Sequence, residues 1–155
     1  MMAAKQAEGR EITMTRFYDA PREIVFRYWT DPRLVAEWWG PEAFVNENIV
    51  WEAVPGGEIR IDMRAPDGSI YPTRGVFHEA VDREKLVFTT GFRDEKTGLF
   101  RMEERTTVTF EDADGGTKLT VHSVVVSCAP EWLTALDGME AGWSQTLERL
   151  ARVLV

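Results

Sequence analysis

Hydrophobic and polar residues alternate along most of the chain between residues 58 and 126. A period of two is typical of antiparallel strands that bury one face. Groups of Gly, Pro and charged residues that favour turns separate the alternating runs, at 55–57, 66–68, 82–84, 94–98 and 112–116. The pattern predicts strands over residues 58–64, 86–92, 100–110 and 117–126, with weaker strands near 43–54 and 71–81.

The same alternation assigns side chains to the buried face of the sheet. In the last strand, Ser123 points inward and His122 outward. A first strand near residues 10–18 has a mixed register, with Ile12 and Met14 on one face and Phe17 on the other. The residues expected to face inward in the four clear strands are Ile59, Ile61, Met63, Leu86, Phe88, Thr90, Phe92, Phe100, Met102, Glu104, Thr106, Val108, Phe110, Leu119, Val121, Ser123 and Val125.

Helical signals stand at two places. Two short helices are expected near residues 21–29 and 32–39, because proline suits a first helical turn and Asp31 is a good N-cap. From residue 130 to 154 the pattern predicts one long helix, whose apolar stripe consists of Leu133, Leu136, Met139, Trp143, Leu147, Leu150 and Leu154. Gly138 and Gly142 interrupt it, each costing about 1 kcal/mol relative to Ala, and indicate a bend or a close approach of a strand or ligand.

These elements predict an α+β fold. An antiparallel sheet with one apolar face needs a cover, and only the C-terminal helix is long enough. We expect a curved sheet of about six to seven strands around that helix, in a single domain over residues 10–155 that follows a flexible tail at 1–9. A strongly bent sheet leaves a gap under its helix, and a ligand cavity would form there.

Composition and charge exclude several partners. The 44% hydrophobic and 28% charged residues are ordinary for a soluble protein. A net charge of -8 repels phosphate backbones, so no nucleic-acid partner is expected. The chain has no secretory signal, no apolar run of ~20 residues and no basic amphipathic helix, so no membrane contact is expected either. Cys128 is the only cysteine; no internal disulfide can form, which fits a cytoplasmic location.

Short segments spread over nearly the whole chain resemble one protein family. They are Arg16-Phe17-Tyr18-Asp19-Ala20-Pro21, Phe26-Arg27-Tyr28-Trp29-Thr30-Asp31-Pro32, Trp38-Trp39-Gly40-Pro41, Pro55-Gly56-Gly57, Pro66-Asp67-Gly68, Gly75-Val76-Phe77-His78-Glu79, Lys85-Leu86-Val87-Phe88-Thr89, and Gly142-Trp143 with Leu147 and Leu150. In these segments the chain resembles the bacterial activator of Hsp90 ATPase homologue-like proteins, of the C-terminal-domain type. That family belongs to the START-like (SRPBCC) superfamily, which includes the birch-pollen allergen.

The resemblance implies a helix-grip (START-like, Bet v 1-like) fold and leaves the activity open. The superfamily includes lipid and hormone carriers, cyclases and co-chaperone domains, so the fold alone does not select among them. The eukaryotic co-chaperones carry a further N-terminal domain, for which this chain is expected to have no room. Chaperone activation is therefore not carried over from the resemblance.

Glu104 is the polar residue with the clearest potential for chemistry. Alternation places it on the same face as Met102, Thr106 and Val108, and a carboxylate there is costly unless it is paired. Desolvation would raise its pKa, so it could bind a polar ligand group or act as an acid or base. Two structural alternatives are a bulge after Arg101 that turns Glu104 outward, and a partner at the rim such as Arg74 or Arg105.

Aromatic and thioether side chains are the expected walls of the cavity. Trp38 and Trp39 are neighbours and point in different directions, so one can anchor the core while the other stands at the entrance; both can also be core residues. The same two interpretations apply to Met139 and Trp143 on the helix stripe. The candidate ligand-binding residues are Trp38, Trp39, Ile61, Met63, Phe88, Phe92, Met102, Glu104, Thr106, Val108, Met139 and Trp143.

The remaining motifs point away from a known catalytic machinery. His78 and His122 have no metal-ligand spacing, Cys128 is expected to be a buried structural thiol, and no nucleophile elbow or phosphate-binding glycine loop is present. No cofactor or metal is therefore expected. The leading hypothesis is non-catalytic binding of a small apolar or amphipathic ligand. The alternatives are a chaperone-interacting module and a cyclase or hydrolase that uses Glu104. Exposed strand edges are compatible with a homodimer.

Overall fold

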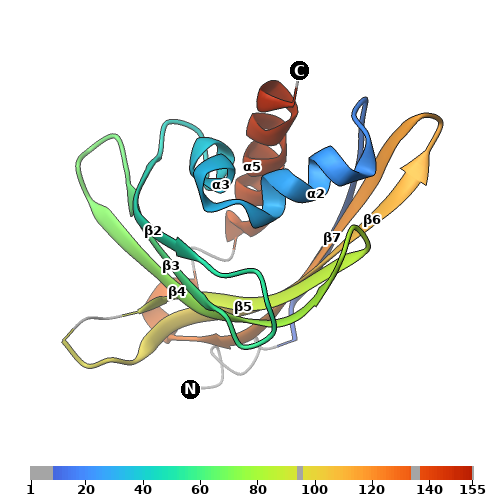
Figure 1. Ribbon diagram of the computed structural model, residues 1–155. Helices are drawn as coiled ribbons and strands as arrows, with labels where there is room; N and C mark the ends of the chain where they lie inside the picture. The colour runs from blue at the N-terminus through green and yellow to red at the C-terminus, as the bar shows by residue number, and fades with distance from the viewer. Residues whose placement is uncertain (1–8, 94–95, 134–136, 155) are drawn as a thin grey trace.

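The protein folds as a seven-stranded antiparallel sheet that curves around its C-terminal helix (Figure 1). The computed structural model describes residues 9–93, 96–133 and 137–154. The strand order is β1-β7-β6-β5-β4-β3-β2. The expected α+β helix-grip architecture is confirmed, and the strands are β1 (Glu11–Tyr18), β2 (Val45–Trp51), β3 (Glu58–Arg64), β4 (Ile70–Val81), β5 (Lys85–Arg93), β6 (Phe100–Ala113) and β7 (Gly116–Cys128).

Two glycines in the middle of the sheet lie where neighbouring strands leave no room for a side chain. A Cβ on Gly75 would lie 2.0 Å from the carbonyl oxygen of Thr89, and one on Gly91 would lie 2.2 Å from that of Met102. Neighbouring strands therefore approach more closely here than a side chain allows. Gly75 and Met102 lie on β4 and β6, on either side of β5, which carries Thr89 and Gly91.

The mixed register predicted for the first strand is resolved in favour of the apolar pair. Ile12 and Met14 pack against the core, while Phe17 is 71% exposed on the outer face. Tyr18 also points inward, and its hydroxyl donates a hydrogen bond of 3.0 Å to the carbonyl oxygen of Leu147. This bond ties the edge strand β1 to the C-terminal helix.

Two short helices, α2 (Arg22–Thr30) and α3 (Pro32–Trp38), follow β1 as the prolines predict. The Asp31 carboxylate accepts a hydrogen bond of 2.9 Å from the backbone N–H of Arg33 and so caps α3. Two buried indoles satisfy the last carbonyls of α2. Trp38 Nε1 donates to Tyr28 at 2.9 Å, and Trp51 Nε1 donates to the next carbonyl at 2.7 Å.

The predicted helix from residue 130 to 154 is confirmed over Met139–Val153 and at Leu133 and Asp137, but it is not one continuous α-helix. A 3-10 helix, η1 (Pro130–Trp132), comes first, and the α-helix α5 (Met139–Val153) starts after Gly138. Thr134, Ala135 and Leu136, like residues 1–8 of the expected tail and 94–95 of an expected turn, lie outside the described residues. The bend that the two glycines indicated is at Gly138, the N-cap of α5.

Arg149 fastens α5 to the end of α3. Its Nη1 donates to the carbonyl oxygens of Trp39, Gly40 and Pro41 at 2.9, 3.0 and 2.9 Å. These carbonyls end a helix and start a loop, so they have no partner within the helix itself. The amide of Asn46 on β2 donates to the Trp39 carbonyl as well, at 2.9 Å. The loop after α3 is therefore held from two sides.

Candidate functional site

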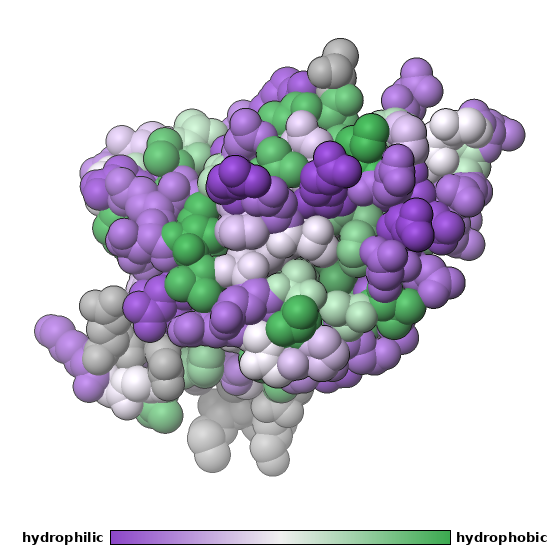
Figure 2. Space-filling view, in the orientation of Figure 1, coloured by the Kyte–Doolittle hydropathy of each residue, from purple (hydrophilic) through white to green (hydrophobic). Residues whose placement is uncertain are grey.

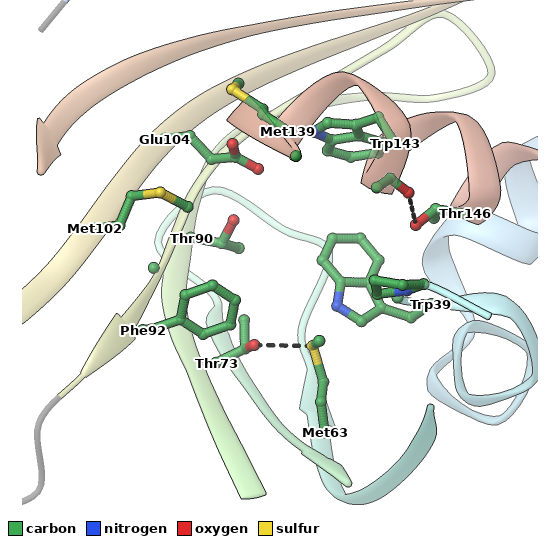
Figure 3. Close-up of a pocket in the computed structure, with 15 residues that line it drawn as sticks. Trp39, Met63, Thr73, Thr90, Phe92, Met102, Glu104, Met139, Trp143 and Thr146 are labelled. Atoms are coloured by element: carbon green, nitrogen blue, oxygen red, sulfur yellow. Dashed lines mark hydrogen bonds between the residues drawn. The ribbon is translucent and has the colours of Figure 1, made fainter. Parts of the chain in front are cut away.

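A cavity of about 220 Å³ lies between the inner face of the sheet and the first turns of α5 (Figure 3). It is partly open to solvent. The loop after α3 forms one wall, strands β3 to β6 form the floor, and α5 forms the roof. Its lining residues are Trp39, Gly40, Pro41, Met63, Thr73, Thr90, Gly91, Phe92, Met102, Glu104, Gly138, Met139, Gly142, Trp143 and Thr146.

The structure brings part of the predicted ligand-binding set together at this cavity. The predicted residues that line it are Trp39, Met63, Phe92, Met102, Glu104, Met139 and Trp143. The other predicted residues do not reach it. Trp38, Ile61, Phe88, Thr106 and Val108 are completely buried in the core. Of the two interpretations of the tryptophan pair, the mixed one describes the structure: Trp38 is a core anchor and Trp39 faces the cavity.

Several cavity residues lay outside the predicted set. Thr90 was assigned to the inward face by alternation but not to the site, and Thr73 lies on β4, where the alternation is weak. The sequence indicates a bend or a close approach of a strand or ligand at Gly138 and Gly142, and both line the cavity. A Cβ on Gly142 would have nothing within 4 Å, whereas one on Gly91 would lie 2.2 Å from the carbonyl oxygen of Met102.

Glu104 lies on the cavity side of β6, as the alternation predicts. Two bulges do occur nearby. Glu103 pairs with Ser127 and Glu104 pairs with Val125, so Val126 is an extra residue of β7, and Phe92 pairs with Met102 and Arg93 with Phe100, so Arg101 is an extra residue of β6. From Met102 onward β6 keeps its alternation, and Glu104 faces the cavity. The hypothesis that a bulge turns this carboxylate outward is wrong.

The rim partners proposed for Glu104 are engaged elsewhere or point away. Arg74 lies 3.0 Å from Asp62 in a largely buried ion pair on β3 and β4, and Arg105 is exposed. Burial raises the pKa of Glu104 to about 7. The side-chain donors of Trp143 and Ser123 favour the charged form and offset part of this rise.

The aromatic rings of Trp39 and Trp143 form a corner of the cavity. Their centroids are 6.0 Å apart and their planes are at 81°. Figure 3 shows the Trp39 ring across the cavity from Glu104 and Thr90, whereas Trp143 lies beside Met139 with its indole nitrogen toward Glu104. On the opposite wall, Phe92 packs edge-to-face against Tyr71 and at a tilt against Trp132, with centroid distances of 6.0 and 5.2 Å. Rings that are held by other rings give the cavity a preformed shape.

Other residues that sequence reasoning considered lie away from the cavity. His122 Nε2 lies 2.9 Å from the carboxylate of Glu11 on the outer face, and His78 Nε2 lies 2.7 Å from the Thr89 hydroxyl. Cys128 is buried, and burial raises its pKa. Within residues 9–93, 96–133 and 137–154, no three His, Cys, Asp or Glu side chains gather in a way that could hold a metal ion.

The surface around the helices is mostly polar. Figure 2 shows hydrophilic residues over much of this face, with hydrophobic patches between them. None of the helices in the described part of the chain combines the length and the apolar character that crossing a bilayer requires.

Comparison with known proteins gives the family. Residues 19–155 match the family described as "Activator of Hsp90 ATPase homolog 1-like protein". The chain belongs to this family. The match starts just after β1 and includes both short helices, the sheet from β2 to β7 and α5, so the whole cavity lies within it. A comparison with curated proteins found no match for this family member.

Solved structures of bacterial proteins share the fold. A protein from Arthrobacter aurescens is 28% identical, with a TM-score of 0.83 over 96% of this chain and 87% of that chain. One from Chromobacterium violaceum is 27% identical, with a TM-score of 0.78 over 93% and 96%. The AHSA1 protein from Silicibacter pomeroyi is 20% identical with a TM-score of 0.79 over 94% and 97%, which is a likeness of fold alone.

Proposed function

We propose that this family member binds a small, mainly apolar ligand in the cavity under α5, without transforming it. The observation that carries the proposal is the cavity itself: about 220 Å³ of space lined chiefly by aromatic and methionine side chains. Pockets for drug-sized ligands are larger, about 300–1,000 Å³, whereas an engineered apolar cavity of about 150 Å³ holds benzene. The ligand is therefore about the size of one substituted ring.

The methionines support an adaptable wall. Met63, Met102 and Met139 come from β3, β6 and α5 and meet around the space. Thioether side chains change shape at low cost and contact rings favourably. The Thr73 hydroxyl donates a hydrogen bond of 3.2 Å to the Met63 sulfur, which is a weak acceptor and so leaves this side chain able to move. Such a wall suits a series of related ring compounds.

A panel of single-ring compounds tests the proposal. Trp39 and Trp143 are part of the cavity wall, so their fluorescence should change when the cavity fills. A ligand present at about 100 times its Kd should stabilise the fold by about 2.7 kcal/mol. If no compound in a panel of neutral, cationic and anionic rings changes either fluorescence or the unfolding midpoint, the proposal is wrong.

A matched pair of variants on α5 locates the binding. Gly142→Leu should fill the cavity, because a side chain at 142 starts in open space, and it should abolish binding. Ala141→Leu adds the same bulk at an exposed position of the same helix and should leave the affinity unchanged. Loss of binding in both variants would mean a general effect on the helix.

The family description favours a second candidate, stimulation of an Hsp90-type ATPase. That role would use the outer surface, so it should survive Gly142→Leu. The test is the ATPase rate of the Hsp90-type chaperone from the same organism, with and without this protein. An unchanged rate at a large excess of the protein would exclude this candidate.

A further inference from the structure

The carboxylate of Glu104 has no counter-charge in its cavity. Among the described residues that line the space, Glu104 is the only side chain that can carry a charge. The groups that face it are Thr90 from β5, Ser123 from β7, and Met139 and Trp143 from α5. The acidic residues at the start of α5, Asp137 and Glu140, are exposed.

A hydroxyl stands directly beside this carboxylate. Thr90 is the register partner of Glu104 across β5 and β6, and both side chains point into the cavity (Figure 3). Side chains of directly paired residues have Cβ atoms about 4.5–5.5 Å apart. A single donor group with several hydrogens can therefore reach the carboxylate and the Thr90 oxygen together.

The facing wall is aromatic. The rings of Trp39 and Trp143 meet at 81°, and the Trp39 ring lies on the side of the cavity opposite Glu104. Tryptophan faces attract cations within about 6 Å of the ring centroid, and a desolvated contact of this kind is stronger than an exposed one. A cation placed between the Trp39 ring and Glu104 would be attracted from both sides.

We propose, as a refinement that rests on the proposed function, that the ligand carries a protonated amine on its small apolar body, and that Glu104 and Thr90 bind the ammonium group. An ammonium group has hydrogens for both oxygens and no acceptor that would be left unpaired. It also supplies the charge that the cavity lacks, since burying a lone carboxylate is unfavourable and pairing it removes that cost. The apolar body would lie against Met63, Phe92 and Met102.

Three probes with the same ring and different head groups test the inference by calorimetry. Benzylamine should bind at least about tenfold more tightly than benzyl alcohol, corresponding to a charge-assisted hydrogen bond. Benzoate should bind least, because its charge has the same sign as that of Glu104. Equal affinity for benzylamine and benzyl alcohol would overturn the amine inference and leave the proposed function intact. Binding of none of the probes, nor of any compound in the wider panel, would overturn both.

The pH dependence in the unmodified protein gives a second readout. The ionised carboxylate is the form that binds the ammonium group, and with a pKa of about 7 it is mostly protonated at pH 6. Benzylamine stays protonated from pH 6 to 8, so its affinity should fall by about tenfold from pH 8 to pH 6. A flat profile, or one that rises toward acid pH, would overturn the inference.

Glu104→Gln should remove both the preference for the amine and its pH dependence, while benzyl alcohol binds as before. Glu111→Gln, an exposed change on the same strand, is the matched control and should change neither. Circular dichroism shows whether the variants fold. A Glu104→Gln protein that still prefers benzylamine would contradict the inference, and the pH profile of the unmodified protein decides the question without any variant.

Discussion

Glu104 couples the stability of the fold to pH. Its pKa in the folded protein, about 7, lies above the ordinary value of 4.5. The folded protein therefore binds this proton more tightly than the unfolded chain does. The contribution of this residue to stability is complete below about pH 4.5, falls as the pH rises toward 7, and is constant above that.

Glu104→Gln is predicted to abolish the loss of stability that Glu104 causes as the pH rises. Relative to the unmodified protein, the free energy of unfolding of the variant should rise between pH 5 and pH 8, by on the order of 3 kcal/mol at most. Urea unfolding at several pH values without ligand measures the difference, in which the effects of other carboxylates cancel. The exposed control Glu111→Gln should show no comparable trend. A difference independent of pH would contradict the buried, unpaired carboxyl.

Two glycines of the cavity wall are predicted to respond oppositely to an added methyl group. Gly142→Ala should stabilise the protein by about 0.5–1 kcal/mol, because alanine favours the helix and its Cβ meets nothing within 4 Å. Gly91→Ala should cost more than about 2 kcal/mol, because its Cβ would lie 2.2 Å from a carbonyl oxygen. Thermal or urea unfolding of the two variants decides this. Stabilisation by Gly91→Ala would show that the strands can separate there.

At the scale of elements, the side chain of Arg149 makes several of the hydrogen bonds that join α5 to the end of α3. Arg149 donates to three consecutive carbonyls after α3, and burial lowers its pKa. Nearby Arg152 pairs with Glu42 in an ion pair whose side chains are 58% and 48% exposed. Both arginines lie in the last turns of α5, so substituting each one compares a partly buried arginine with an exposed one on the same helix.

Arg149→Met is predicted to destabilise the fold by about 2–3 kcal/mol, because buried carbonyls lose a charged donor. The methionine keeps the apolar stem of the side chain. Arg152→Met should cost less than about 1 kcal/mol, as is usual for an exposed pair. Denaturant unfolding of both variants is the measurement. If the two losses are equal, the Arg149 contacts contribute no more than a surface ion pair.

The elements themselves could largely be predicted from the sequence, and the break at Gly138 shows where such prediction stops. Alternation located the strands because each buries one face, and Pro32 with Asp31 marked the start of α3. The apolar stripe from Leu133 onward, however, has helical spacing on both sides of Gly138. The spacing of apolar residues alone therefore does not show that the helix is interrupted at Gly138.

For the whole molecule, the interior has a packed end and a hollow end, and β3, β6 and α5 each contribute residues to both. On β3, Ile61 is in the core and Met63 lines the cavity. On β6, Val108 is in the core and Met102 lines the cavity. Alternation puts both residues of each pair on the buried face of the sheet. The sequence therefore predicts that they face inward, but not whether they lie at the packed end or at the hollow end. The division depends on how far α5 extends over the sheet, which only the assembled fold determines.

Helix α5 offers the sharpest test of that division, because Leu147 and Met139 lie on its buried stripe at opposite ends. Leu147 is 1% exposed and belongs to the packed end, and Met139, 7% exposed, lines the cavity. Leu147→Ala should cost about 2–5 kcal/mol, since it opens a void among packed neighbours. Met139→Ala should cost about half as much, because one side of this residue already faces empty space and loses no contact there.

The same two variants should differ in binding. Met139→Ala enlarges the cavity, so a two-ring compound such as naphthalene should raise its unfolding midpoint more than it raises that of the unmodified protein. Leu147→Ala removes atoms from a region outside the cavity lining and should gain no such response. Equal losses of stability together with equal responses to naphthalene would mean that the interior is uniform. If one end of the core is a ligand chamber, Met139→Ala should lose less stability than Leu147→Ala and should respond more strongly to naphthalene.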